Sequence, residues 1–218
     1  MPEPKLNPPT LKSRTLQRRA YRLFFRESIR TIRSTAALLP SSRFLATAML
    51  EQVDFRKAYT LVELGSGTGV ITREILRRMA PDSRLYTLEI NRNFVRHLRA
   101  HCQDRRLTVL QADAADLLHQ LRTHHAGPIQ AVVSSLGLTG MSPQQRSRIV
   151  QAAETCLAPA GVMTQFQYLT SQAPVPHWPN VRIRRFEEKM FLQSYFSSVS
   201  AKRVLLNFPP AVVFTCRK

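Results

Sequence analysis

The chain has 218 residues, of which 44% are apolar, a composition that excludes general disorder and suits one α/β domain with an added segment. No run approaches the roughly 20 apolar residues of a spanning helix, and the first residues lack the apolar stretch of a secretory signal, so we expect a cytoplasmic protein. The 32 basic and 14 acidic residues give a net charge of +18, which attracts nucleic acid or an anionic membrane surface.

The first 39 residues are predicted to form a segment of their own. Residues 1–10 are rich in proline and are predicted to be disordered, and residues 11–39 favour one helix with two separate stripes at a period of 3.6 residues. The apolar stripe contains Tyr21, Phe24, Phe25, Ile29 and Ile32, and the basic stripe contains Arg19, Arg22, Arg26, Arg30 and Arg33. Such a helix is typical of one that lies in a membrane interface, and a helix packed on the core with a solvated arginine face is the alternative.

Strands and helices alternate in residues 40–218, which are predicted to form the main domain. Pro40 ends the first helix, and Ser41 or Ser42 is expected to cap a second one that runs to about Val53. Strands are expected at 60–63, 85–89, 107–111, 129–134 and 161–168, and helices at 70–79, 91–101, 116–124 and 142–157. Repeated strand–helix units imply a parallel sheet covered on both faces.

The last two strands differ from the others. They are expected at 200–206 and 211–216, and the connection between them is short. A parallel crossover needs a dozen or more residues, so these two strands are predicted to be antiparallel. The three cysteines, Cys102, Cys156 and Cys216, have no zinc-ligand or redox spacing, and we expect reduced thiols and no metal site.

A glycine-rich turn follows the first strand of the main domain. Gly65, Gly67 and Gly69 are spaced as G-x-G-x-G, and glycine there permits a tight turn and close approach of backbone to a ligand. Glu63 stands just before the turn, where a carboxylate would repel a pyrophosphate and suits a cationic group. The amino group of S-adenosylmethionine is such a group, bound directly or through water. An ordinary strand–helix turn is the alternative.

Two acidic residues at later strand ends extend this constellation. Glu89 follows Gly69 by 20 residues, where a carboxylate can accept both ribose hydroxyls of a nucleoside. Asp113 is placed to accept a hydrogen bond from an adenine amine, with the Ala114 N–H donating to a ring nitrogen. Asp116 is interpreted as a helix N-cap, and a second cap is the alternative for Asp113.

In this order, the glycine turn, Glu89 and Asp113 resemble the class I S-adenosylmethionine-dependent methyltransferases, over about residues 40–218. The resemblance implies a Rossmann-like α/β fold with a seven-stranded sheet whose last strand is antiparallel. It implies S-adenosylmethionine as cofactor and S-adenosylhomocysteine as product. The cofactor-binding residues would be Glu63, Gly65, Ser66, Gly67, Gly69, Glu89, Ile90, Asp113, Ala114 and Ser134.

Several further segments are similar to bacterial phospholipid N-methyltransferases. They are Leu39-Pro40-Ser41-Ser42, Leu88-Glu89-Ile90-Asn91, Val132-Val133-Ser134-Ser135-Leu136, Gln165-Phe166-Gln167-Tyr168 and Val204-Leu205-Leu206-Asn207-Phe208-Pro209-Pro210-Ala211. Gly137 stands where this family is expected to have a proline. The resemblance implies stepwise methylation of phosphatidylethanolamine to phosphatidylcholine by an enzyme attached to the inner face of the cytoplasmic membrane. It also implies that the N-terminal helix binds anionic lipid, with Arg19, Arg22, Phe24, Phe25, Arg26 and Arg30 as the membrane-binding residues.

The acceptor side is predicted from fewer observations. Tyr168 and Ser134 are the candidates to orient the amine, and Arg43 and His177 are the candidates to bind the lipid phosphate. A net positive charge with interspersed aromatic residues also suits RNA binding, so an RNA adenine N-methyltransferase is the rival hypothesis. The acceptor motif of such enzymes is, however, missing after residue 132. An ornithine-lipid N-methyltransferase is a further alternative, and a non-catalytic binding module is a third.

Overall fold

The computed structural model describes residues 41–169, 187–207 and 209–218, with the side chains of Ser41 and Ser42 left out. The predicted N-terminal helix and His177 lie outside these residues. Within them no helix is long and apolar enough to cross a membrane. The three cysteines are all free, and Cys216 is buried.

A seven-stranded sheet forms the centre of the fold, with strand order β3-β2-β1-β4-β5-β7-β6. Its strands are β1 (Thr60–Leu64), β2 (Arg84–Leu88), β3 (Leu107–Leu110), β4 (Ile129–Ser134), β5 (Leu157–Tyr168), β6 (Ser198–Val204) and β7 (Ala211–Arg217). The first five are parallel, and β7 is antiparallel to both of its neighbours. The predicted Rossmann-like fold is therefore confirmed.

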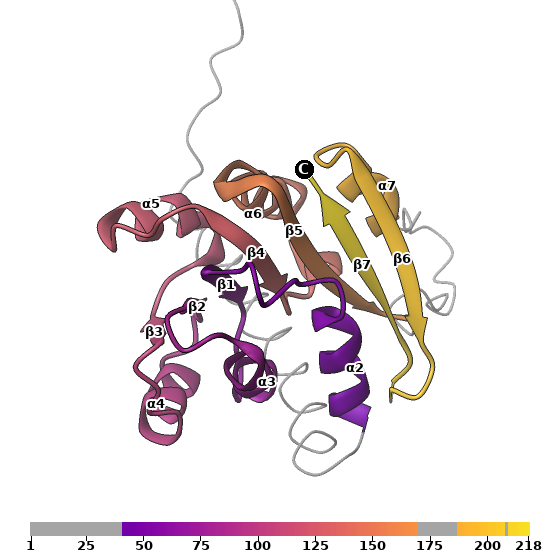
Figure 1. Ribbon diagram of the computed structural model, residues 1–218. Coiled ribbons are helices and arrows are strands. Elements are labelled where there is room, and N and C mark those ends of the chain that lie inside the picture. Colours follow the sequence, from indigo (N-terminus) through magenta and orange to yellow (C-terminus); the bar gives the residue numbers. More distant parts are fainter. Residues whose placement is uncertain (1–40, 170–186, 208) are drawn as a thin grey trace, which may run out of the picture. The chain divides into compact units, whose positions relative to one another are not determined.

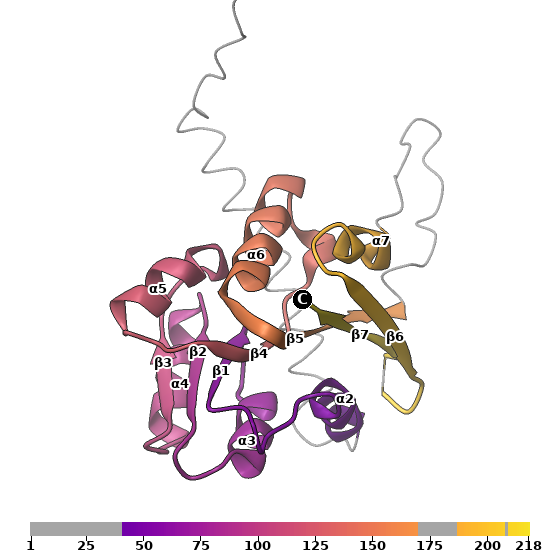
Figure 2. The same ribbon diagram turned by 45° about the horizontal axis from the view of Figure 1, so that its top comes forward.

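Helices cover both faces of this sheet. One face carries α2 (Ser41–Leu50), α3 (Val70–Arg78) and α4 (Arg92–His101), and the other carries α5 (Leu117–Thr123), α6 (Pro143–Cys156) and α7 (Glu188–Gln193) (Figure 2). Short 3₁₀ turns occupy Ala114–Asp116 and Leu138–Gly140. Within the described ranges, α7 and the second of these turns have no counterpart among the predicted elements.

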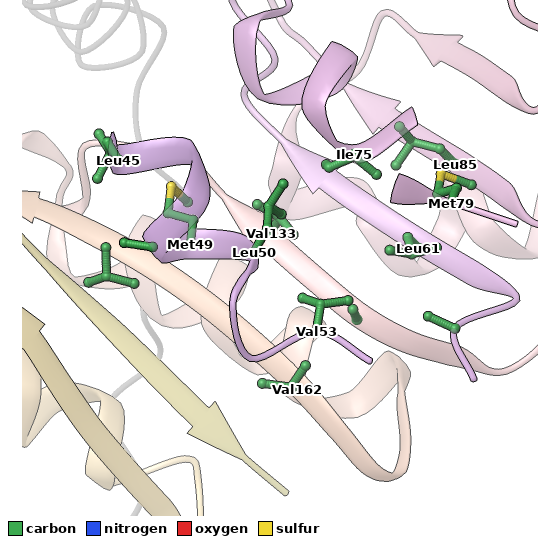
Figure 3. Packing of buried hydrophobic residues seen from close by; sticks show 14 of the residues in the cluster. Leu45, Met49, Leu50, Val53, Leu61, Ile75, Met79, Leu85, Val133 and Val162 are labelled. Carbon is green, nitrogen blue, oxygen red and sulfur yellow. The ribbon is translucent and has the colours of Figure 1, made fainter. Parts of the chain in front are cut away.

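The helix α2 begins at Ser41, so both serines lie in its first turn, whereas one of them was expected to precede it as a cap. The helix ends at Leu50 and not near Val53. Its apolar side chains Leu45 and Met49 are buried against β5 and β7, in one cluster with residues of α3 and β1 (Figure 3). Burial of each such side chain contributes about 1.5–3 kcal/mol, which fixes α2 beside the C-terminal half of the sheet.

The parallel strands point the same way, so their carboxyl ends meet at one edge of the sheet (Figure 1). The loops after β1, β2, β3 and β4 leave from this edge. The loop between β6 and β7 lies at the same edge, because Val204 and Tyr168 are both paired with Ala211. In open α/β sheets ligands bind at such an edge.

Candidate active site at the carboxyl edge of the sheet

The glycine turn between β1 and α3 has the backbone that its sequence predicts. Gly65, Gly67 and Gly69 have φ values of 78°, 53° and 79°, in the left-handed region that favours glycine. A Cβ at Gly65 would lie 2.8 Å from Leu136 Cδ2, and one at Gly69 would lie 2.4 Å from Leu98 Cδ1. A Cβ at Gly67 would meet nothing within 4 Å. A Cβ at either of the outer two glycines would thus force a leucine side chain to shift, whereas Gly67 borders open space.

Glu89 closes the turn from the end of β2. Its Oε2 accepts a hydrogen bond from the Gly67 N–H at 2.9 Å, and its Oε1 accepts one from the Asn91 N–H at 2.8 Å. The side chain is 2% exposed, and burial raises the pKa of its carboxyl. Each carboxylate oxygen has a second acceptor position, so Glu89 holds the loop and can still accept ribose hydroxyls.

Glu63 lies beneath the turn and is fully buried. Its Oε2 accepts a hydrogen bond from the Thr72 hydroxyl of α3 at 2.6 Å. Burial raises the pKa of Glu63 to about 7, against smaller opposing effects of Thr72 and Thr87. The side chain therefore supports the turn from below, and of the two predicted modes the one through water fits this burial better than direct contact.

The remaining predicted cofactor residues lie in the turn itself or in the loops that leave the same edge of the sheet. Asp113 is the N-cap of a 3₁₀ turn, and its Oδ1 accepts a hydrogen bond from the Ala115 N–H at 2.9 Å, which leaves Oδ2 for a ligand. Asp116 precedes α5 as predicted but makes no side-chain capping hydrogen bond. Ile90 is 42% exposed beside Glu89, a position that suits packing against a flat apolar ring, and the Ser66 hydroxyl is buried without a partner.

Ser134 and Tyr168, the two predicted amine-orienting residues, end neighbouring strands but point to opposite faces. Ser134 is paired in register with Gln165, and Tyr168 lies three residues further along β5. Because side chains alternate along a strand, Ser134 faces α6 while Tyr168 packs into the cluster around α2. A single amine could therefore contact both side chains only beyond the strand ends, and the predicted roles of Ser134 and Tyr168 stay predictions.

A chain of contacts links α7 to the glycine turn through Gln165 and Leu136, two residues for which no role was predicted from the sequence. Glu188, at the start of α7, is 2% exposed, and its carboxyl interacts with the Gln165 side chain. The Gln165 amide donates to the Leu136 carbonyl at 2.8 Å, and Leu136 packs against Gly65. Burial raises the pKa of Glu188 to about 8, partly offset by Gln165 and by Arg146 of α6. Glu188 is thus connected through Gln165 to the loop that follows β4.

Different signals mark these unpredicted residues. Gln165 is a polar residue in an apolar strand, and Thr72 lies in the first turn of the helix after the glycines, so either could have been selected from the sequence. Glu188 lies in a polar stretch and carries no such signal. Arg43 is exposed in the first turn of α2. A phosphate-binding role for Arg43 stays a prediction.

The geometry of the site is suited to binding S-adenosylmethionine. The open space at Gly67 admits a ligand against the backbone, Glu89 can accept ribose hydroxyls, and Asp113 keeps one free carboxylate oxygen near the end of β3. A cofactor with a nucleoside and no pyrophosphate matches this set, because the acidic residues near the turn disfavour a phosphate group. Fold and turn together define a class I S-adenosylmethionine-dependent methyltransferase.

Comparisons with known proteins agree. Residues 61–161 match the family model described as a methyltransferase domain. The chain is 30% identical over 183 residues to an ornithine lipid N-methyltransferase of Singulisphaera acidiphila, a match that covers 84% of this chain and 88% of that protein. The chain belongs to the class I S-adenosylmethionine-dependent methyltransferases, and its cofactor is S-adenosylmethionine.

Solved structures of low sequence identity share the fold. A Burkholderia thailandensis 1,6-didemethyltoxoflavin-N1-methyltransferase with bound S-adenosylhomocysteine has a TM-score of 0.65 and 14% identity, covering 99% of this chain and 93% of that one. A T. thermophilus 16S rRNA N2 G1207 methyltransferase has a TM-score of 0.58 and 16% identity, covering 85% of this chain and 44% of that one. Their different acceptors mean that the fold by itself does not identify the substrate.

Proposed function

We propose that this enzyme methylates the primary amine of a membrane-lipid headgroup. The observation that carries the proposal is the 30% identity, over most of both chains, to an ornithine lipid N-methyltransferase. The sequence pattern favours phosphatidylethanolamine as acceptor, and this relative favours ornithine lipid. Both lipids carry a primary amine beside a lipid chain, so the same site chemistry serves either one.

S-adenosylmethionine supplies a methyl group that is activated by its sulfonium. The chain must hold the acceptor amine within roughly 3–3.5 Å and in line with that group. Backbone around Gly67 and the carboxylate of Glu89 would hold the nucleoside end, and the loop after Ser134 would border the acceptor. These residues position the reactants and exclude water, which is most of what a methyl transfer requires.

The acceptor amine must be neutral to react, although a free alkylammonium has a pKa of roughly 10. Burial of the site lowers that pKa by disfavouring the charged form. The Tyr168 hydroxyl is neutral at pH 7, and burial raises its pKa further above the ordinary value. A neutral hydroxyl can accept a hydrogen bond from the amine N–H and orient its lone pair, and this is the role we propose for Tyr168.

Transfer of a radiolabelled methyl group tests the proposal. The full chain would be given S-adenosylmethionine with detergent micelles of phosphatidylethanolamine, micelles of ornithine lipid, or total RNA. We expect label in one or both lipids, with mass spectrometry identifying the product, and none with Glu89→Ala. Label confined to RNA would replace the lipid proposal with the rival hypothesis, and label in no acceptor would overturn both.

Membrane attachment on the inner face of the cytoplasmic membrane is part of the proposal. The net charge of +18 supports it, since each basic residue near an anionic surface contributes about 1 kcal/mol. Sedimentation with phosphatidylglycerol vesicles should therefore fall as salt rises, and the double charge reversal Arg22→Glu with Arg26→Glu should weaken it. Sedimentation that is unaffected by salt and by this variant would exclude the predicted role of the N-terminal residues.

A further inference from the structure

The loop between β6 and β7 exposes two adjacent leucines. Leu205 is 67% exposed and Leu206 is 72% exposed, while the next residue, Asn207, is 4% exposed. The Asn207 side-chain amide donates to the Pro209 carbonyl at 2.7 Å, which holds the turn. The two leucines are thus exposed on a turn that is itself held in place by a hydrogen bond.

The first turn of α2 adds to this surface. Figures 1 and 2 both show the β6–β7 loop beside α2. The other end of α2 lies further back along the strands, because Glu51 pairs with Lys202 and Gln52 accepts a hydrogen bond from Arg217. The first turn therefore lies on the side of the loop, and it carries Phe44, which is 45% exposed.

Basic residues flank these apolar side chains. Arg43 precedes Phe44 on α2, and Arg203 lies two residues before Leu205 on the face of β6 that points away from α2; both are exposed. Glu51, just after the end of α2, is paired with Lys202, which offsets its charge. We define the tip surface as Arg43, Phe44, Arg203, Leu205 and Leu206. Exposed apolar residues with cations at their margin complement an anionic lipid surface, where the apolar groups enter the interface and the cations meet headgroups.

The position of the tip surface agrees with the route that a lipid acceptor needs. The β6–β7 loop adjoins the end of β5, at the same edge of the sheet as the glycine turn. A headgroup whose acyl chains stay in the bilayer can reach the cofactor only if this edge faces the membrane. We propose that the tip surface docks on an anionic phospholipid bilayer and turns the active-site edge toward it. This proposal rests on the proposed lipid acceptor.

A fluorescent probe tests the docking directly. The full-length variant Leu206→Cys would be labelled with an environment-sensitive nitrobenzoxadiazole group and mixed with phosphatidylglycerol vesicles. We expect the emission to shift to the blue and to rise severalfold, as it does in an apolar medium. The matched control is Tyr59→Cys, because Tyr59 is 58% exposed just before β1, at the opposite edge of the sheet. Its probe should keep its aqueous emission, and labelled unsubstituted protein gives the background from the native cysteines.

The double variant Leu205→Glu with Leu206→Glu tests whether the tip surface is needed for vesicle binding and for methylation of lipid in vesicles. Removing each leucine from an apolar interface should weaken vesicle binding on the order of tenfold. Methyl transfer to lipid in vesicles should fall accordingly, while transfer to lipid in detergent micelles and binding of S-adenosylhomocysteine should stay within twofold of the unsubstituted enzyme.

The outcomes separate this proposal from the proposed function. Aqueous emission at position 206 on vesicles that sediment the protein would overturn the docking surface, even if lipid is methylated. A shift with RNA in place of vesicles would also overturn it. If the probe enters vesicles but no lipid is methylated in micelles, the docking surface stands and the lipid acceptor fails.

Discussion

Substitution of Gly67 by alanine should separate cofactor binding from folding. The new Cβ meets no protein atom within 4 Å, so the strain of φ 53° is the main cost to folding, about 1–2 kcal/mol. For a chain of this size that cost lowers Tm by roughly 2–8 °C. The Gly67 N–H that binds Glu89 is kept, so the substitution isolates the effect of one methyl group in the open space.

Gly69→Ala is the matched control, because Gly69 has a similar positive φ but a filled neighbourhood. Its Cβ would lie 2.4 Å from Leu98 Cδ1, which adds overpacking of about 1–3 kcal/mol to the strain. The total is about 2–5 kcal/mol, and Gly69→Ala should be the less stable of the two variants.

Urea unfolding and calorimetry with S-adenosylhomocysteine measure the two effects. If Gly67 borders the cofactor, Gly67→Ala should lose at least about tenfold in affinity, or about 1.4 kcal/mol, although it is the better folded variant. Gly67→Ala with unchanged affinity and near-normal stability would refute the reasoning, since the open space at Gly67 would then not receive the cofactor.

Three other perturbations test buried polar groups. The pKa of Glu63 is raised from 4.5 to about 7. Its contribution to the free energy of unfolding is therefore fully present below about pH 4.5 and is lost as the pH rises to 7. In Glu63→Gln, the free energy of unfolding measured in urea should not show this decrease. Glu188→Gln should keep kcat/KM for the lipid acceptor near normal at pH 7, because an amide can still hydrogen bond to Gln165. Glu188→Leu should lower kcat/KM at least about tenfold, with little change in the affinity for the cofactor. Arg106 donates to Leu76 and Met79 carbonyls near the end of α3 and pairs with Asp104, and Arg106→Ala should destabilise the fold by roughly 2–3 kcal/mol in urea.

Each of these has an outcome that contradicts it. Identical pH dependence of unfolding in Glu63→Gln and the unsubstituted enzyme would mean that Glu63 does not titrate between pH 4.5 and 7. Equal activity of Glu188→Gln and Glu188→Leu would show that the contact with Gln165 does not position the loop after β4. If Arg106→Ala lowers the free energy of unfolding by less than about 0.5 kcal/mol, the Arg106 interactions contribute no more than an ordinary surface ion pair.

The cofactor site was predictable from the sequence because its determinants are local. Gly65, Gly67 and Gly69 have positive φ in a turn of five residues, and their spacing is visible in the sequence. Glu89 follows at the interval that one strand–helix–strand unit imposes. Alternating strands and helices likewise predict a parallel sheet, since each strand needs a crossover to lie beside its neighbour.

Other features were decided by packing between segments that are far apart in the chain. The opposite orientation of Ser134 and Tyr168 depends on the register between β4 and β5, which only the assembled sheet defines. The raised pKa of Glu188 depends on burial between α7 and the sheet, and the sequence around Glu188 does not predict that burial.

The spacing of residues thus predicted the alternating strands and helices and the glycine turn, and the resemblance to known methyltransferases indicated the class of protein. The tertiary structure decided which polar groups lose contact with water, which strand ends come together, and that Leu205 and Leu206 stay exposed at the active-site edge. The physical reason is that turn conformation depends on a few neighbouring residues, whereas solvation and side-chain direction depend on every segment that packs nearby.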